Sequence, residues 1–178
     1  MERYHDTEWG VPLHNDRKLF EFLLLDSFQA GLSWSTILNK REHFRKAFDN
    51  FNPKRVAKYR RVDIKRLLTD EGIVRNRLKV NAAVSNARLF LEIQKEYGSF
   101  DSYVWKFVGG KPKVGNWKSF EQIPATSSES DALSIDLKKR RFSFVGSTII
   151  YAFMQASGLA NDHVASCFRY KKLRRLSQ

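Results

Sequence analysis

Cysteine, proline and glycine are scarce in this chain of 178 residues, which has one cysteine, four prolines and nine glycines. The single thiol, Cys167, excludes an internal disulfide and is typical of a reducing compartment. No apolar run approaches the roughly 20 residues that cross a bilayer, and no charged and then apolar leader opens the chain. We therefore expect a cytoplasmic protein with no membrane attachment through a spanning segment.

Several catalytic signatures are also missing. The sequence has no glycine-rich nucleotide loop, no Gly-x-Ser-x-Gly elbow and no Cys-x-x-Cys pair, which excludes kinase, α/β-hydrolase and dehydrogenase functions.

Acidic residues are few as well. The chain has 19 Asp and Glu against 32 Lys and Arg, which gives a formal charge of +13. This excess favours an anionic polymer or surface as the partner.

What the chain does have is enough apolar surface to fold. Hydrophobic residues make up 42% of it and aromatics 13%, which excludes disorder as the main state. The length supports one core or two small lobes that share one, but not two independent domains. Apolar residues recur at spacings of three and four, the helical period. The sequence thus predicts a monomeric, all-α, single domain over 1–178, with two helical lobes around one cleft.

The expected helices follow from caps and from this period. We expect helices over 16–30, 34–48 and 75–97, the first capped by Asp16 and the second by Ser33. The first of them carries the most apolar residues and is expected to lie in the core.

A short helix, a glycine-centred turn and a longer helix follow one another over about 61–97. Gly72 lacks a Cβ and lets the backbone approach a phosphate, and the next helix presents unpaired N–H groups at its start. Arg75, Arg77 and Lys79 add positive charge there. This order predicts a helix-hairpin-helix, which grips a DNA backbone without reading its sequence. An ordinary helix connection with a hydrated basic face is an equal alternative on spacing alone.

Asp26 is the most informative single residue. It lies three and four places after Leu23 and Phe22, so its carboxylate falls on or beside an apolar helix face. Burying an unpaired charge costs several kcal/mol, so such a residue is paired, protonated or kept for a function. A local pair with Arg or Lys, or a hydrogen bond near Ser27, is the alternative to a functional role.

Aromatic residues near candidate helix ends are candidates for a base pocket. Tyr4, Trp9 and Trp34 could stack on a base and favour a cationic one, although core packing is the alternative for each. Leu32 follows Gly31 in a turn between two helices, where it could fill the gap left by an extruded base. Otherwise Leu32 is a plug between the helices.

His163 and Cys167 stand four residues apart on an expected helix, the spacing of two metal ligands on one face. His5 and Asp6 could complete the site from the N-terminus. Zinc is therefore a candidate structural cofactor with an incomplete ligand set, and a packed thiol beside a capped helix is the alternative.

Several segments, in matching order and spacing, resemble 3-methyladenine DNA glycosylase I. They are YHDTEWGVP at 4–12, QAGLSW at 29–34, SDALS at 130–134, FVGST at 144–148 and NDHV at 161–164. The resemblance spans nearly the whole chain. It implies a helix-hairpin-helix glycosylase fold and a bacterial base-excision enzyme. Such an enzyme acts on double-stranded DNA with alkylated bases and hydrolyses the N-glycosidic bond of 3-methyladenine.

The resemblance also assigns residues. It implies that the acidic residue three places before QAGLSW recognises the extruded base, and that residue is Asp26, where the family ordinarily has Glu. Tyr4, Trp9 and Trp34 match the aromatic base pocket of the family, and Leu32 matches its duplex-probing turn.

The family's structural zinc is held by two Cys and two His. His5, His163 and Cys167 match three of these ligands, and the first Cys belongs to an N-terminal segment with no counterpart in this sequence. No lysine is placed as a Schiff-base nucleophile, so strand cleavage is not expected. Two other functions stay open from the sequence. One is a lesion-binding protein with weak or no excision activity, and the other is a general DNA-binding module.

Overall fold

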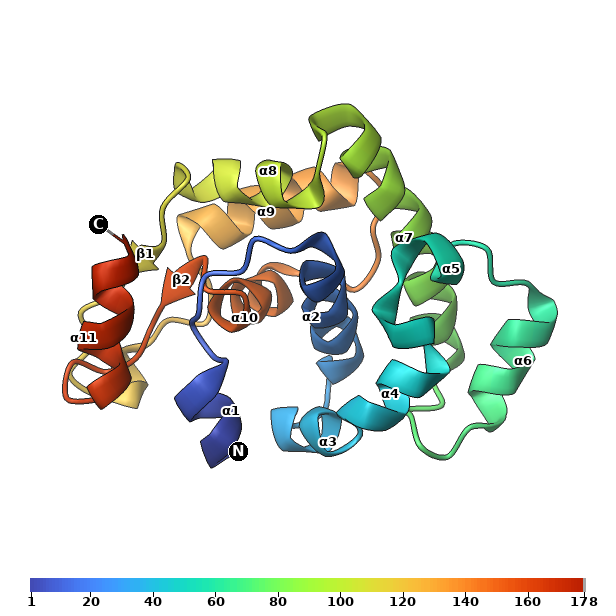
Figure 1. Ribbon diagram of the computed structural model, residues 1–178, viewed down its shortest axis with the longest axis horizontal. Helices are drawn as coiled ribbons and strands as arrows, with labels where there is room; N and C mark the ends of the chain where they lie inside the picture. The colour runs from blue at the N-terminus through green and yellow to red at the C-terminus, as the bar shows by residue number, and fades with distance from the viewer. Residues whose placement is uncertain (178) are drawn as a thin grey trace.

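The computed structural model describes residues 1–177 and is almost entirely helical (Figure 1), which confirms the expected all-α class. The α-helices are α1 (Glu2–Thr7), α2 (Asp16–Gln29), α3 (Trp34–Asn39), α4 (Arg41–Ala47), α5 (Pro53–Val56), α6 (Arg61–Thr69), α7 (Arg77–Tyr97), α8 (Phe100–Trp105), α9 (Ser128–Lys139), α10 (Ser147–Ala156) and α11 (Phe168–Arg174). Short 3-10 turns are η1 (Asp49–Phe51), η2 (Lys106–Val108), η3 (Phe120–Gln122) and η4 (Arg175–Ser177).

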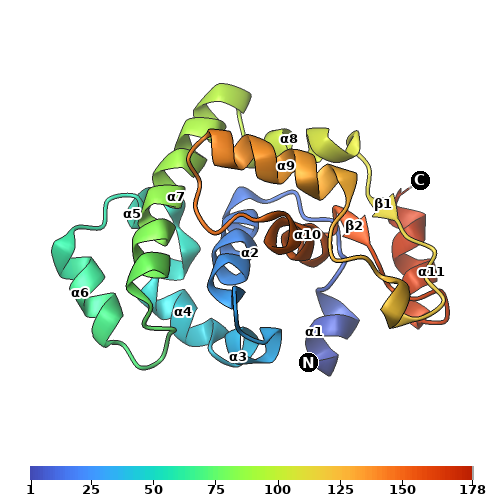
Figure 2. The same ribbon diagram turned by 180° about the vertical axis from the view of Figure 1, so that it is seen from behind.

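Helices α2 and α10 pack against each other at the centre of the molecule. Helices α3 to α7 lie to one side of this pair, and α8, α9 and α11 lie to the other, as both views show (Figures 1 and 2). A single continuous cluster of buried side chains, from Tyr4 to Ala160, joins the two sides. The two lobes therefore share one core, with α2 and α10 as its middle.

The start of α2 is tied to the opposite lobe. Asn15 caps the helix, because its side chain accepts a hydrogen bond from the N–H of Lys18 at 3.1 Å. The expected cap, Asp16, is instead the first helical residue. Its carboxylate accepts the backbone N–H groups of Phe100 and Asp101, each at 2.8 Å. The sequence analysis therefore placed the cap of α2 one residue too late, because the carboxylate of Asp16 binds the start of α8 instead.

The segment after Ser33 forms two helices rather than one. Ser33 caps α3 as expected, by accepting the N–H of Thr36 at 3.2 Å. The N–H of Lys40 then bonds to the carbonyl of Ile37 at 3.1 Å, three residues back. This tighter turn ends α3 and redirects the chain into α4.

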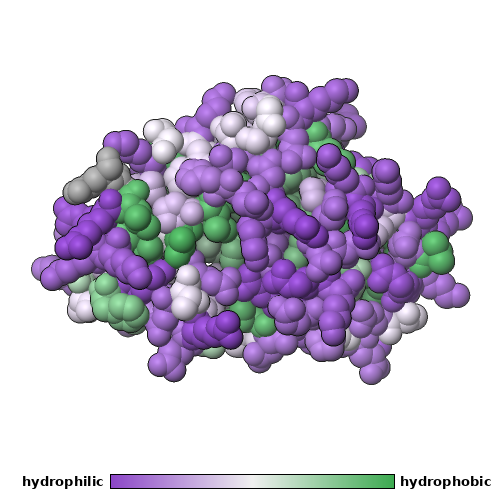
Figure 3. Space-filling model, in the orientation of Figure 1, coloured by the Kyte–Doolittle hydropathy of each residue, from purple (hydrophilic) through white to green (hydrophobic). Residues whose placement is uncertain are grey.

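The only strands within residues 1–177 are two short ones. β1 (Lys113–Val114) and β2 (Ala160–Asn161) pair in parallel and connect α11 to the loop before α9. No helix in this part of the chain is long and apolar enough to cross a membrane. The face seen in Figure 3 is mainly hydrophilic, with small and scattered apolar patches.

Gly158 holds the segment after α1 against the end of α10. Its φ is +73°, and an added Cβ would lie 2.3 Å from the backbone nitrogen of Pro12 and 2.3 Å from the carbonyl carbon of Val11. The N–H of Leu13 donates to the carbonyl of Ser157 at 3.0 Å in the same place. Because the approach is backbone on backbone, only glycine fits at this position.

We expect Gly158→Ala to lower the free energy of unfolding by about 3 kcal/mol, through a strained φ together with overpacking. Gly98→Ala is the matched control, since Gly98 has a φ of +82° with no atom within 4 Å of an added Cβ. That change should cost only about 1 kcal/mol. Urea unfolding of both variants measures the difference, and equal losses would show that the close approach at Gly158 carries no cost.

Candidate active site

Asp26 lies in the last two turns of α2 and is 2% exposed. Its Oδ2 has no hydrogen-bond partner within residues 1–177, and no Lys or Arg in that range pairs with it. Burial raises the pKa of this carboxyl well above its ordinary value. The neighbouring hydroxyl of Ser27 donates to the carbonyl of Leu23 at 2.7 Å instead. The local ion pair that could have explained Asp26 is absent.

A cavity of about 320 Å³ lies beside this carboxyl. Three elements enclose it: the end of α2, the turn at residues 30–32, and the first half of α10. The lining residues are Asp26, Gln29, Ala30, Gly31, Leu32, Thr148, Ile149 and Ala152. The volume falls at the lower end of the range of about 300–1,000 Å³ that is typical of ligand sites.

The turn at residues 30–32, which we call the probing turn, leaves its leucine on the surface. Gly31 has a φ of +77° and open space around it, so glycine is needed there for the backbone conformation alone. Leu32 is 41% exposed and is one of several large apolar residues on the surface. The structure therefore does not place Leu32 as a plug inside the protein.

Tyr4 and Trp34 pack against each other, and neither ring lines the cavity beside Asp26. Their ring centroids lie 5.4 Å apart, although one ring comes from α1 and the other from the start of α3. Burial and the charge of Asp26 raise the pKa of Tyr4, so the phenol and the carboxyl are near neighbours. The indole Nε1 of Trp34 is buried and has no hydrogen-bond partner within the described chain. Unpartnered buried donors and acceptors are uncommon outside binding sites.

Trp9 does not join this pair, which corrects the grouping expected from the sequence. Its ring lies 4.4 Å from that of His163 and 6.1 Å from that of His5. Trp9 was grouped with the other aromatics because all of them lie near candidate helix ends and match the base pocket of the family. The turn that ends α1 instead directs its indole toward His163 and His5.

The three expected metal ligands do converge. One donor atom from each of His5, His163 and Cys167 lies within 4.8 Å of the others, and His5 Nε2 is 3.6 Å from Cys167 Sγ. The expected helix through His163 and Cys167 is wrong: the chain there is irregular between β2 and α11. Cys167 instead occupies the cap position of α11. A turn, rather than a helical face, brings the two together.

The donor set fits zinc. The Nδ1 atoms of His5 and His163 face the side-chain oxygens of Asp6, at 2.7 Å, and Asn161, at 3.0 Å, as in the oxygen partners that orient metal-binding histidines. His163 Nε2 is buried with no hydrogen-bond partner in the described chain. Burial, aided by His5 and Arg169, lowers the pKa of His163 to about 4, which keeps the neutral imidazole that binds metal.

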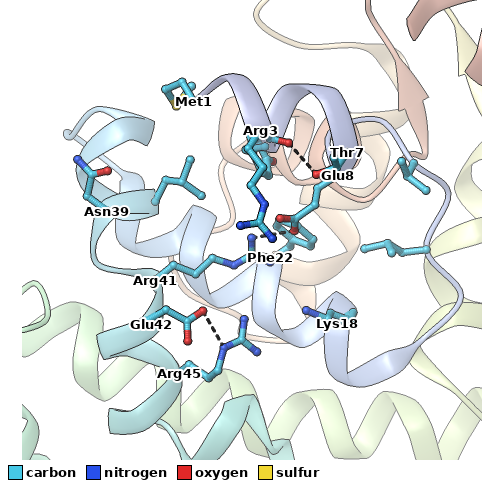
Figure 4. Close-up of a pocket in the computed structure, with 14 residues that line it drawn as sticks. Met1, Arg3, Thr7, Glu8, Lys18, Phe22, Asn39, Arg41, Glu42 and Arg45 are labelled. Carbon is cyan, nitrogen blue, oxygen red and sulfur yellow. Dashed lines mark hydrogen bonds and ion pairs between the residues drawn. The ribbon is translucent and has the colours of Figure 1, made fainter.

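A second cavity, of about 680 Å³, lies between α1, α2 and the α3–α4 region (Figure 4). Its floor carries an ion network that the sequence analysis missed. Arg41 donates to Glu21 and to Glu8, both at 2.8 Å, and Arg45 donates to Glu21 at 3.0 Å. The signal in the sequence was an acidic residue, Glu21, on the apolar helix α2, together with two arginines four residues apart that could pair with it. These pairs fix α1, and with it Tyr4, onto α2.

The two helices and the turn predicted over about 61–97 are present as α6 and α7, and their assignment as a DNA-binding helix-hairpin-helix stays a prediction. Helix α7 begins at Arg77 rather than Arg75, because the side chain of Asn76 caps it by accepting the N–H of Lys79 at 3.1 Å. The side chains of Arg75 and Arg77 are exposed, and within residues 1–177 only Arg75 has an ion pair, a long one of 3.4 Å to Glu71.

Two residues of the hairpin differ from their expected placement. Gly72 does not face open space: an added Cβ would lie 2.7 Å from Nδ1 of His43, so the exposed ring of His43 would have to move to accept a side chain there. Lys79 does not add to the exposed charge, since it is only 7% exposed and its side chain points inward. The spacing predicted the start of α7 two residues too early and did not show which side of the helix faces the core.

Comparisons with known proteins agree on one family. The family described as Methyladenine glycosylase matches residues 1–170. The chain is 49% identical to DNA-3-methyladenine glycosylase 1 of Escherichia coli over 94% of this chain and 89% of the relative. It is 44% identical to DNA-3-methyladenine glycosylase of Haemophilus influenzae over 92% of this chain and 89% of that protein.

Solved structures agree with this. A crystal structure of 3-methyladenine DNA glycosylase I is 50% identical, with a TM-score of 0.91 over 94% of this chain and 92% of that one. A Staphylococcus aureus structure that describes 3-methyladenine recognition by the same kind of enzyme is 39% identical, with a TM-score of 0.92 over 95% of this chain and 90% of that one.

The raised pKa of Asp26 predicts a stability cost that depends on pH. In the unfolded chain the carboxyl loses its proton near a pKa of about 4. In the folded protein the proton is held to higher pH, so stability falls as the pH rises between the two values.

We therefore expect Asp26→Asn to raise the free energy of unfolding at pH 7 by about 1–3 kcal/mol, and by much less at pH 4. Thermal unfolding across this range measures the effect, with the exposed Glu92→Gln as the control. A loss of stability at pH 7 would mean that the ionised carboxylate has a stabilising partner.

Proposed function

Because the chain belongs to the methyladenine glycosylase family, we propose that it hydrolyses the N-glycosidic bond of 3-methyladenine in alkylated duplex DNA. The observation that carries the proposal is the buried and unpaired carboxyl of Asp26 beside a cavity. We further propose that the protein acts as a monomer in the cytoplasm of a bacterial cell, as a monofunctional enzyme of base excision repair.

Asp26 supplies selectivity for a cationic base. Methylation at N3 gives the purine a positive charge, and a carboxylate in a site shielded from water attracts it far more strongly than it would in solution. Ordinary adenine is neutral, so its binding does not offset the desolvation cost of the Asp26 carboxylate. The carboxylate also accepts a hydrogen bond from the exocyclic amino group. Since Asp is one methylene shorter than the family's usual Glu, the base has to lie closer to α2.

Tyr4 and Trp34 provide the rings that contact the base. Their rings are tilted with 5.4 Å between centroids, and Tyr4 lies near the carboxyl of Asp26. Ring quadrupoles favour a cationic ligand over a neutral one of the same shape. Trp9 acts indirectly, because its contact with His163 helps to fix α1.

The DNA is held by its backbone and opened by the probing turn. The exposed Arg75 and Arg77 are placed to contact phosphates, and the net charge of +13 supports a strong dependence of affinity on salt. Leu32 enters the stack where the damaged nucleotide leaves it, and Gly31 permits the turn that presents it.

The chemical step needs little acid catalysis. As the carbon–nitrogen bond breaks, its electron pair goes to the positively charged purine, which leaves as neutral 3-methyladenine. Water adds to the sugar carbon as oxocarbenium character develops and loses one proton, which leaves an abasic site. The protein contributes by holding the cationic base and excluding other bases.

We expect the purified protein to release free 3-methyladenine from N-methylated duplex DNA, and Asp26→Asn to reduce the rate by about 10²-fold, as loss of one charge-assisted contact does. The assay is release of the free base under single-turnover conditions, with Glu92→Gln as the matched carboxyl control. Binding to methylated DNA without release would favour a lesion-binding protein. Equal binding to damaged and intact duplex, also without release, would favour a general DNA-binding module.

We also propose that His5, His163 and Cys167 hold a structural zinc ion. The ion would join α1 to the segment before α11, which come from opposite ends of the chain, and would so support the position of Tyr4. It takes no part in the reaction, because the donor set lies on the Trp9 side and is separate from the cavity beside Asp26.

Protein purified without chelator should contain about one equivalent of zinc, and Cys167→Ser should contain much less, with a lower melting temperature. His14→Ala is the control, because His14 is exposed and bonded to Asp101 away from the cluster. Elemental analysis decides, and a content below about a tenth of an equivalent in the wild-type protein would dismiss the site.

A further inference from the structure

Lys79 is the third residue of α7, immediately after the hairpin turn, yet its ammonium is inside the protein. Nζ donates to the backbone carbonyl of Phe28 at 2.8 Å and to that of Ala30 at 2.5 Å. The side chain is 7% exposed. A cation so placed is not available to a phosphate, and it does not line the cavity beside Asp26.

The two carbonyls belong to the end of α2, where the chain passes into the probing turn. The last carbonyls of a helix have no partner within the helix and attract positive charge. The carbonyl between them, that of Gln29, accepts the N–H of Leu32 at 2.6 Å. Three successive carbonyls are thus satisfied, two of them by Lys79. The turn that presents Leu32 is therefore fixed at its base by a side chain from the hairpin.

A second lysine, Lys40, connects the same two regions in the opposite direction. Lys40 lies at the end of α3, the helix that follows the probing turn. Its Nζ donates to the carbonyl of Glu71 at 2.9 Å and to that of Gly72 at 3.4 Å, both in the hairpin turn. The hairpin thus holds the backbone before the probing turn through Lys79, and the helix after that turn holds the backbone of the hairpin through Lys40.

These bonds tie segments that are far apart in the sequence. Phe28 and Lys79 are separated by 51 residues, and Lys40 and Glu71 by 31. Helix α3 and the start of α7 also lie on the same side of the molecule in both views (Figures 1 and 2). The hairpin and the probing turn therefore form one unit rather than two independent loops.

We propose that Lys79, together with Lys40, is a positioning residue that locks the probing turn to the hairpin. The grip on the phosphate backbone then sets the place at which Leu32 enters the base stack. This inference rests on the proposed function, because it concerns the step in which the damaged nucleotide is extruded. It predicts that the two lysines affect extrusion and leave backbone binding unchanged.

Lys79→Met and Lys40→Met test the lock, because methionine keeps most of the apolar stem and removes the ammonium. Lys95→Met is the matched control, since Lys95 lies on the same helix α7, is exposed and has no such bond. Thermal unfolding establishes that each variant is folded. If Lys79→Met does not fold, the half-buried Lys40→Met still tests the proposal.

Three measurements follow on each folded variant. The first is the affinity for intact duplex as a function of salt. The second is the fluorescence of 2-aminopurine placed opposite a stable abasic-site analogue, which reports entry of Leu32 into the gap. The third is single-turnover release of 3-methyladenine. We expect affinity and salt slope to match the control, the fluorescence change to shrink, and release to slow about tenfold, because a displaced turn costs orientation.

A salt slope reduced by about one unit in Lys79→Met would overturn the proposal, because the ammonium would then be a phosphate contact. Fluorescence and release equal to those of Lys95→Met would overturn it as well. A wild-type protein that fills the gap but releases no base would refute the proposed function and leave the lock standing. A wild-type protein that leaves the reporter unchanged would refute the lock.

Discussion

The site depends on a carboxyl that is buried without a partner in a protein with a formal charge of +13. Such a group attracts any cation that can reach it, yet two buried cations of the protein have other partners. Arg41 is held by Glu8 and Glu21, and the ammonium of Lys79 is held by backbone carbonyls. The carboxyl of Asp26 therefore keeps the full desolvation cost of its burial, and under the proposed function this cost is the source of its selectivity.

The features that periodicity and composition control were predictable from the sequence. The burial of Asp26 followed from its spacing on an apolar helix, and the hairpin followed from a glycine between two helical patterns. The orientation of individual side chains was not. Lys79 stands at the start of a helix that has a core side and an exposed side, and spacing alone does not tell which of them the third residue occupies.

The proposed metal ligands show a second limit of the sequence analysis. His163 and Cys167 were paired on a helical spacing that does not exist, and they meet because a turn before α11 folds back. Trp9 was grouped with the base pocket because it lies near a candidate helix end and matches the family's aromatic pocket, and the end of α1 turns it toward the histidines. Residue types identified the chemistry, whereas long-range packing decided which groups share a site.

Helix α2 is fastened at both ends, since Asp16 binds the N–H groups at the start of α8 and the carbonyls at its other end bind Lys79. A helix anchored in this way has little freedom to shift when a duplex arrives. The deformation has to be borne by the nucleic acid, so base steps that are already weakly stacked or poorly paired are the easiest to engage. Rigidity of the protein thus becomes a filter for damage before any base is inspected chemically.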